Sequence, residues 1–244
     1  MKRTVLITGG ARGIGAACSF LFAKNSYFVI VNYNESGKEA KLLKEKIEAM
    51  GEKCAILKAD LSKKEEVENM FFEIEKRIGF VDVLINNCGI AQQKLFLDTS
   101  LEDWEKVFYI NLFSMFFCCK KILPNMIREK KGKIINISSV WGEVGAACET
   151  IYSSSKAAVI GFTKALAKEV ALSKINVNCI APGVIKTDML NFLDEKEIEE
   201  IEEKIPIGKI GSPFDVANAA LFLADEKSNY INGEILDVGG GFCR

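Results

Sequence analysis

The sequence of 244 residues contains no histidine. A chain without histidine cannot carry a Ser-His-Asp triad, a Cys-His pair or a histidine-ligated zinc site. Any proton transfer must therefore use Tyr, Lys, Asp, Glu or Cys side chains. The eight cysteines show no Cys-x-x-Cys spacing, so the sequence predicts no metal site and mostly buried, free thiols rather than four disulfides.

The sequence also lacks an excess of one charge and a long apolar run. Its 32 basic and 33 acidic residues give a net charge of -1, which is not typical of a nucleic-acid-binding protein. Lys, Asp or Asn interrupts the longest apolar stretches, so we expect no membrane-spanning helix. The apolar run at residues 5–8 is too short for the core of a signal peptide. These features predict a soluble cytoplasmic protein.

Short β-branched segments alternate with longer helical patterns along the chain, in which 49% of the residues are apolar. Strands are expected at residues 3–8, 28–32, 53–58, 83–86, 133–138, 174–180 and 234–238. Helices are expected at 14–25, 37–50, 63–78 with Ser62 as N-cap, 101–128, 151–172 and 213–224. This alternation predicts a single α/β domain over residues 1–244, a Rossmann-type doubly wound, seven-stranded parallel sheet with helices on both faces.

Residues 194–204 are the most highly charged part of the chain. They follow Pro182-Gly183 and precede Pro206. The segment is interpreted either as a solvated helix or as a mobile lid over a substrate, because lids are polar and weakly anchored.

A glycine-rich segment follows the first predicted strand and precedes the first predicted helix. It reads Thr-Gly-Gly-Ala-Arg-Gly-Ile-Gly over residues 8–15. Glycines here allow a tight turn and a close approach to a pyrophosphate, which the N–H groups and dipole of the helix N-terminus attract. The segment therefore predicts a dinucleotide phosphate site, although a merely tight turn would have a similar composition.

Further motifs follow in order along nearly the whole chain. They are Asp60-Leu61, Asn86-Asn87-Cys88-Gly89, Asn111, Ser139, Tyr152-x-x-x-Lys156, and Pro182-Gly183 with Thr187. Together with the spacing Thr-Gly-x-x-x-Gly-x-Gly, they resemble the short-chain dehydrogenase/reductase family. The resemblance implies an NAD(P)-dependent oxidoreductase with cofactor contacts at Gly9, Arg12, Gly13, Ile14, Gly15, Asn34, Asp60, Leu61, Asn87, Gly89, Tyr152, Lys156, Ile185 and Thr187.

The expected catalytic group consists of Asn111, Ser139, Tyr152 and Lys156. Tyr152 and Lys156 are four residues apart, which places both on one face of a helix. A nearby ammonium lowers a tyrosine pKa that is ordinarily near 10, so we expect Tyr152 to act as general acid and base. Ser139 lies thirteen residues before Tyr152, as in the family, and would hydrogen-bond the substrate oxygen. The resemblance implies that Asn111 holds a water linking Lys156 to solvent.

The second predicted strand ends Val31-Asn32-Tyr33-Asn34, without the acidic residue that usually binds the ribose 2′-hydroxyl of NAD. Arg12 can instead pair with the 2′-phosphate of NADP. Glu35 lies about 20 residues after Gly15, near the general acidic position, and is interpreted as a solvated residue just past the strand. The sequence therefore favours NADP(H) over NAD(H).

Within this family, the chain most resembles the bacterial 3-oxoacyl-[acyl-carrier-protein] reductases. The matching residues include Gly142, Thr187-Asp188-Met189 and Tyr230-Ile231-x-Gly233. The resemblance implies NADPH-dependent reduction of a 3-oxoacyl thioester in fatty acid biosynthesis. The alternatives are another carbonyl or alcohol substrate, such as acetoacetyl-CoA, a steroid, a sugar or a small ketone, and more remotely a non-catalytic dinucleotide sensor or scaffold.

Two features of the sequence bear on the binding of a partner protein and on the assembly of subunits. The first is a basic cluster before the catalytic strand, interpreted as a docking site for an acidic acyl carrier protein or as a solvated loop, at Arg128, Lys130, Lys131 and Lys133. The second is a set of aromatic residues on more than one face of the predicted helix at 101–128, namely Phe108, Phe113, Phe116 and Phe117. The family resemblance implies that such helices pair between subunits in a homotetramer.

Two residues depart from the family pattern. Cys88 replaces the usual alanine and is interpreted as a tolerated core thiol or as a reactive thiol near the nicotinamide. Glu149 lies three residues before Tyr152, where related reductases often carry an uncharged residue. It is expected to face the substrate or a subunit interface, and it bears on the choice of substrate.

Overall fold

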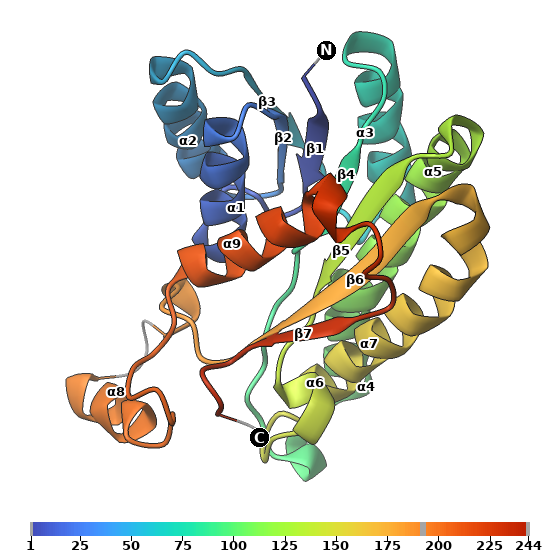
Figure 1. Cartoon of the computed structure of the whole chain (residues 1–244). Coiled ribbons are helices and arrows are strands. Elements are labelled where there is room, and N and C mark those ends of the chain that lie inside the picture. The colour runs from blue at the N-terminus through green and yellow to red at the C-terminus, as the bar shows by residue number, and fades with distance from the viewer. Residues whose placement is uncertain (1, 191–193, 243–244) are drawn as a thin grey trace.

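The structure is a computed structural model that describes residues 2–190 and 194–242. Its strands form one parallel sheet in the order β3-β2-β1-β4-β5-β6-β7 (Figure 1). The strands are β1 (Thr4–Ile7), β2 (Phe28–Tyr33), β3 (Cys54–Lys58), β4 (Val83–Asn86), β5 (Gly132–Ile137), β6 (Ile175–Pro182) and β7 (Ile235–Val238). The predicted fold class is confirmed.

The continuous apolar runs in the central strands supply two hydrophobic cores, because successive side chains point to opposite faces of a sheet. In β1, Val5 and Ile7 belong to one core, while Leu6 belongs to the other. The strands β2 and β4 alternate in the same way.

Helices cover both faces of the sheet (Figure 1). One core contains residues of α1 (Gly13–Lys24), α2 (Gly37–Ala49) and α9 (Pro213–Ala224). The other face carries α3 (Lys64–Arg77), α4 (Leu101–Phe108), α5 (Ser114–Glu129) and α7 (Thr150–Val170). Short 3₁₀-helices occupy Phe96–Asp98, Ala171–Ser173, Asp188–Leu190 and Glu226–Ser228.

The start of α3 differs from the sequence prediction by one residue. Lys63, rather than Ser62, is the N-cap. The Ser62 hydroxyl instead donates a hydrogen bond of 2.7 Å to Oδ1 of Asp60. The predicted N-cap was therefore wrong, because a nearby carboxylate competes for the serine.

The helix predicted at 101–128 runs from Leu101 to Glu129, but it contains a π-helical segment at Tyr109–Phe113 between α4 and α5. By length and composition alone this helix could cross a membrane, but a helix in the core of a folded domain can have the same length and composition. Its buried residues pack in the core against the sheet; they include Met115, Cys118, Ile122 and Met126.

Two helices flank the lower end of the sheet in Figure 1. The helix α6 (Trp141–Val144) packs against α7 and was not predicted. The charged segment forms α8 (Glu195–Glu202), which Asp194 caps through a hydrogen bond from the Glu197 N–H, and no residue of α8 is buried. The segment is thus a solvated helix, and its movement as a lid stays a prediction.

Candidate active site

A cleft of about 1030 Å³ lies at the carboxyl ends of the strands, where parallel α/β sheets bind ligands. The loops after six of the strands, β1 to β6, contribute to its lining. Among the predicted site residues, Gly15 and Asn111 lie outside the lining, and all the others contribute to it. The structure thus brings the separate motifs to one place.

The turn between β1 and α1 requires glycine for two different reasons. Gly13 has a φ of +50°, in the left-handed region, and a side chain there would press on Thr187. Gly15 packs beneath the turn, where an added Cβ would lie 2.7 Å from Nδ2 of Asn87. The N-cap, Arg12, makes no side-chain cap, so no N-cap side chain covers the first N–H groups of α1. This arrangement fits a pyrophosphate.

Two buried or partly buried asparagines hold this turn in place. The Asn87 amide donates to the carbonyl oxygens of Thr8 (3.0 Å) and Gly9 (3.1 Å). Asn32 accepts a bond of 3.3 Å from the Gly9 N–H and donates one of 3.1 Å to the Ala59 carbonyl. Asn32 therefore supports the turn from inside, a role that its position at a strand end did not reveal.

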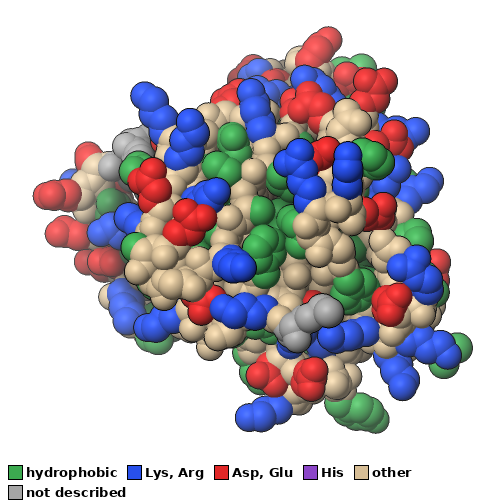
Figure 2. Space-filling view, turned by 90° about the horizontal axis from the view of Figure 1, so that it is seen from above, with side chains coloured by type: hydrophobic (Ala, Val, Ile, Leu, Met, Phe, Trp, Pro, Cys, Tyr) green, Lys and Arg blue, Asp and Glu red, His purple; other side chains and the backbone are tan. Residues whose placement is uncertain are grey.

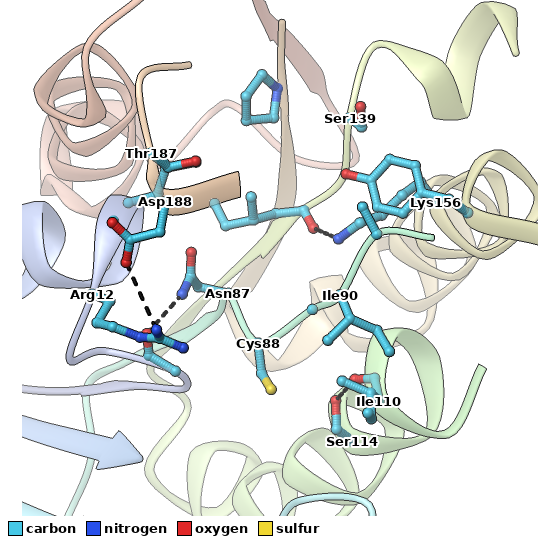
Figure 3. A pocket seen from close by; sticks show the side chains of 18 of the residues that line it. Arg12, Asn87, Cys88, Ile90, Ile110, Ser114, Ser139, Lys156, Thr187 and Asp188 are labelled. Carbon is cyan, nitrogen blue, oxygen red and sulfur yellow. Dashed lines mark hydrogen bonds and ion pairs between the residues drawn. The ribbon is translucent and has the colours of Figure 1, made fainter. Parts of the chain in front are cut away.

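The end of the cleft that is lined by the turn between β1 and α1 carries charges of both signs. Asn34 and Glu35 are exposed and line the cleft, so Glu35 is solvated as expected but remains close to the cofactor region. The Arg12 guanidinium lies 3.7 Å from the Asp188 carboxylate, which comes from the segment after β6 (Figure 3).

Three of the four predicted catalytic residues line the cleft, namely Ser139, Tyr152 and Lys156; Figure 3 labels Ser139 and Lys156. Ser139 follows β5, and its hydroxyl lowers the pKa of Tyr152, which lies in the first turn of α7. Lys156 donates a bond of 2.9 Å to the Ile137 carbonyl, and its Nζ lies 5.7 Å from the centre of the Tyr152 ring. Ser138 instead donates to the backbone carbonyl of Lys156, at 2.8 Å.

Burial dominates the ionisation of this pair. It raises the pKa of Tyr152 to about 12, although the Ser139 hydrogen bond lowers it and the Glu149 carboxylate raises it further. Burial also lowers the pKa of Lys156 to about 8. The expectation that Lys156 would bring the Tyr152 pKa below its ordinary value is therefore wrong for this structure, because removal from water has the largest effect on this phenol.

Asn111 lies in the π-helical segment, a feature frequent at functional sites, and is buried. Its Oδ1 accepts a bond of 2.8 Å from the Ile90 N–H, and its Nδ2 donates to the Ile90 carbonyl and to Oγ of Ser155, both at 3.0 Å. Ser155 in turn donates to the Tyr152 carbonyl at 2.7 Å. Asn111 thus ties the loop after β4 to α7, and the water expected beside it stays a prediction.

The hydrogen bonds of Ser155 were not identified from the sequence. Its contact with Asn111 spans 44 residues of sequence, so no local pattern could have indicated it. The same holds for Trp141, which lines the cleft and donates its backbone N–H to Oγ of Ser139 at 3.2 Å.

The two departures from the family pattern have different environments. Cys88 packs against the second core, and burial raises the pKa of its thiol to about 11, which favours the inert thiol. Glu149 is half-buried, lines the cleft and is the N-cap of α7, but its side chain makes no cap hydrogen bond. Burial raises the pKa of its carboxyl.

Within residues 2–190 and 194–242, no group of three or more Cys, Asp or Glu side chains is placed to hold a metal ion.

Comparison with known proteins indicates the same family as the sequence motifs do. The family model described as Enoyl-(Acyl carrier protein) reductase matches residues 9–243. The chain is 43% identical over 237 residues to the 3-oxoacyl-[acyl-carrier-protein] reductase FabG of Aquifex aeolicus, with 97% of this chain and 95% of the relative covered. It is 38% identical over 241 residues to FabG of Staphylococcus epidermidis strain RP62A, with 99% of each covered.

Two further relatives carry other descriptions. The uncharacterized oxidoreductase YmfI of Bacillus subtilis is 39% identical over 243 residues, with 99% of each chain covered. The crystal structure of a putative gluconate dehydrogenase from Agrobacterium tumefaciens matches with a TM-score of 0.95 and 29% identity, covering 99% of this chain and 96% of that one. From its motifs, its cleft and these relatives, the chain belongs to the short-chain dehydrogenase/reductase family and is an NAD(P)-dependent oxidoreductase.

Proposed function

We propose that the chain, acting as one domain in the cytoplasm, reduces a 3-oxoacyl thioester on an acyl carrier protein to the 3-hydroxyacyl product, using NADPH. The observation that carries the chemistry is that Ser139, Tyr152 and Lys156 line the same cleft, with the Lys156 Nζ 5.7 Å from the centre of the Tyr152 ring. The relatives named as 3-oxoacyl-[acyl-carrier-protein] reductases support the choice of substrate.

In this proposal the bound nicotinamide supplies the hydride. Tyr152 donates its phenolic proton to the carbonyl oxygen as negative charge develops there. A pKa of about 12 keeps this phenol protonated at neutral pH, which suits reduction. Ser139 hydrogen-bonds the same oxygen, and Lys156, whose pKa of about 8 is close to neutrality, returns a proton towards Tyr152.

The residues present fit a nicotinamide dinucleotide along the cleft. The turn at residues 9–15 would hold the pyrophosphate, and Asp60-Leu61 would hold the adenine. Asn34 and Arg12 would contact the ribose end, while Ile185 and Thr187 would cover the nicotinamide. NADP is preferred because Arg12 can leave Asp188 for a 2′-phosphate, since that ion pair is exposed and 3.7 Å long.

A homotetramer is part of the same proposal. Aromatic side chains remain exposed on the helix that contains the π-helical segment, at Tyr109, Phe113 and Phe116. A contiguous apolar patch of this kind is typical of an interface. Pairing of these helices between subunits would remove it from water.

The basic cluster does not support docking of the carrier as expected. Lys133 is buried and donates to Oδ1 of Asn176 at 3.0 Å. Lys131 pairs with Asp82 at 2.6 Å, and these residues lie at the amino end of β5, about 20 Å from the cleft at its other end. On the face shown in Figure 2, Lys and Arg side chains are interspersed with Asp and Glu.

A second candidate is a reductase of a carbonyl compound that is not bound to an acyl carrier protein. The half-buried Glu149 carboxylate in the cleft favours it, since neither a thioester nor a fatty acyl chain requires an acid there. The relative YmfI, described only as an oxidoreductase, is 39% identical to this chain, between the 38% and 43% of the two FabG proteins.

A substrate panel tests the proposal. NADPH oxidation is measured with acetoacetyl-acyl carrier protein, acetoacetyl-CoA and neutral methyl ketones, each repeated with NADH. The proposal expects the highest kcat/KM for the carrier-bound thioester with NADPH. Higher kcat/KM for a free ketone would favour the second candidate, and no oxidation with any of them would overturn both.

A further inference from the structure

Glu149 carries a carboxylate that the structure leaves without a protein partner. Among residues 2–190 and 194–242, no hydrogen bond or ion pair reaches its side-chain oxygens, although the side chain is half-buried and lines the cleft. Removal of a carboxylate from water is unfavourable unless a cation or hydrogen-bond donor replaces the water. Retaining such a group in a cleft therefore indicates that the partner comes from outside the chain.

The local structure holds Glu149 in this place without satisfying it. A carboxylate at an N-cap usually accepts a hydrogen bond from the first turn of its helix, but Glu149 does not do so in α7. The preceding residue, Cys148, has a φ of +61°, and its carbonyl accepts a bond of 2.7 Å from the Lys94 N–H. This anchored turn restricts the direction in which Glu149 leaves the backbone.

Glu149 lies close enough to the reacting group to affect it. Its charge acts on Tyr152, whose pKa it raises. Trp141 also lines the cleft and contacts Ser139 through its backbone N–H. A carboxylate and an indole ring are the two kinds of group that bind an organic ammonium, through an ion pair and a cation–π contact.

Besides Arg12 and Lys156, one basic residue among the described residues lines the cleft, and its side chain does not pair with the carboxylate. Lys106 lines the cleft but is exposed, and it forms no ion pair with Glu149 among the salt bridges of the described residues. The charge of Glu149 is therefore free to act on a substrate.

We propose that Glu149 is a specificity-determining residue that selects carbonyl substrates bearing an ammonium group near the reacting carbonyl. The inference rests on the proposed carbonyl reduction by Tyr152, but it does not require an acyl-carrier substrate. A substrate with a carboxylate at the same place would be excluded by like-charge repulsion, and a neutral one would leave Glu149 unpaired.

The test compares three methyl ketones of equal length that end in a dimethylammonium, an isopropyl or a carboxylate group. A tertiary amine is chosen because it cannot condense with its own ketone to form a cyclic imine. NADPH-dependent reduction is measured for the unmodified protein, for Glu149→Gln, and for Glu143→Gln as matched control. Glu143 undergoes the same chemical change on exposed helix α6, outside the cleft lining.

The unmodified protein should prefer the ammonium ketone over the neutral one at least tenfold in kcat/KM, mainly through KM, which is the scale of one charge-assisted hydrogen bond. Glu149→Gln should reduce this preference to about twofold, and Glu143→Gln should retain it. Unchanged thermal unfolding would show that the Gln variant is folded.

The outcomes separate the two proposals. Reduction of the neutral ketone with no ammonium preference, or a preference that survives in Glu149→Gln, overturns the inference and leaves the proposed reductase intact. Absence of reduction with all three ketones and with acetoacetyl thioesters overturns both.

Discussion

The Nζ atom of Lys156 lies 5.7 Å from the centre of the Tyr152 ring and donates a hydrogen bond to the carbonyl of Ile137. Burial shifts the two groups in opposite directions, with the Tyr152 pKa at about 12 and the Lys156 pKa at about 8. At neutral pH the phenol therefore holds its proton, while the ammonium can exchange one. This combination favours proton donation to a substrate and reprotonation from the lysine side.

Changing Tyr152 to Phe removes the proposed proton donor and retains the ring. We expect kcat to fall by at least about a hundredfold, the usual scale for a general acid. Binding of NADPH, followed by fluorescence titration, should change little because the phosphate turn is untouched. Near-normal turnover in this variant would contradict the mechanism.

Changing Lys156 to Met should stabilise the protein at pH 7. Because burial lowers the Lys156 pKa from 10.5 to about 8, the unfolded chain binds more protons between these values and stability rises with pH through that window. Below pH 8 the buried ammonium lowers the free energy of unfolding by its full amount, on the order of 3 kcal/mol. The hydrogen bond to Ile137 partly offsets this loss.

Urea unfolding measures this difference. The Met variant should exceed the unmodified protein by about 1–3 kcal/mol at pH 7, and the gap should narrow by pH 9.5. A Met variant less stable at pH 7 would show that the ammonium is better stabilised than its burial indicates. Activity should be lost in either case.

Arg12 should determine the choice of cofactor. We expect a higher kcat/KM with NADPH than with NADH, and Arg12→Ala should reduce that preference by at least about tenfold, since a charge-assisted contact to the 2′-phosphate is lost. Arg77→Ala is the control, because Arg77 pairs with Glu73 on the surface of α3 and lies outside the cleft. An NADH preference in the unmodified protein would instead assign the ribose contact to Glu35 or Asn34.

Assembly should depend on the exposed aromatic residues of the helix from Leu101 to Glu129. Light scattering at micromolar concentration should give the mass of a tetramer, and Phe113→Glu with Phe116→Glu should lower it, because charges would be buried at the interface. Phe72→Glu, at an exposed position on α3, should leave the mass unchanged. A monomer mass for the unmodified protein would contradict the proposal.

The sequence by itself determined the strands, most of the helices and the family. Buried parallel strands need continuous apolar runs, and the central strands lie where those runs occur. The glycines of the first turn, and the spacing from Tyr152 to Lys156, follow from local backbone geometry. These features depend on neighbours in sequence, so the printed chain was enough to predict them.

Tertiary structure decided what surrounds those residues. It linked Asn111 to Ile90 and Ser155. It also buried Lys156 and partly buried Tyr152, which raised the Tyr152 pKa where a nearby ammonium alone would have lowered it. It also removed two residues of the basic cluster from the free surface charge, because Lys133 is buried and Lys131 pairs with Asp82. Burial, ion pairing and hydrogen bonding between distant segments depend on which groups folding brings together, and no local pattern in the sequence records that.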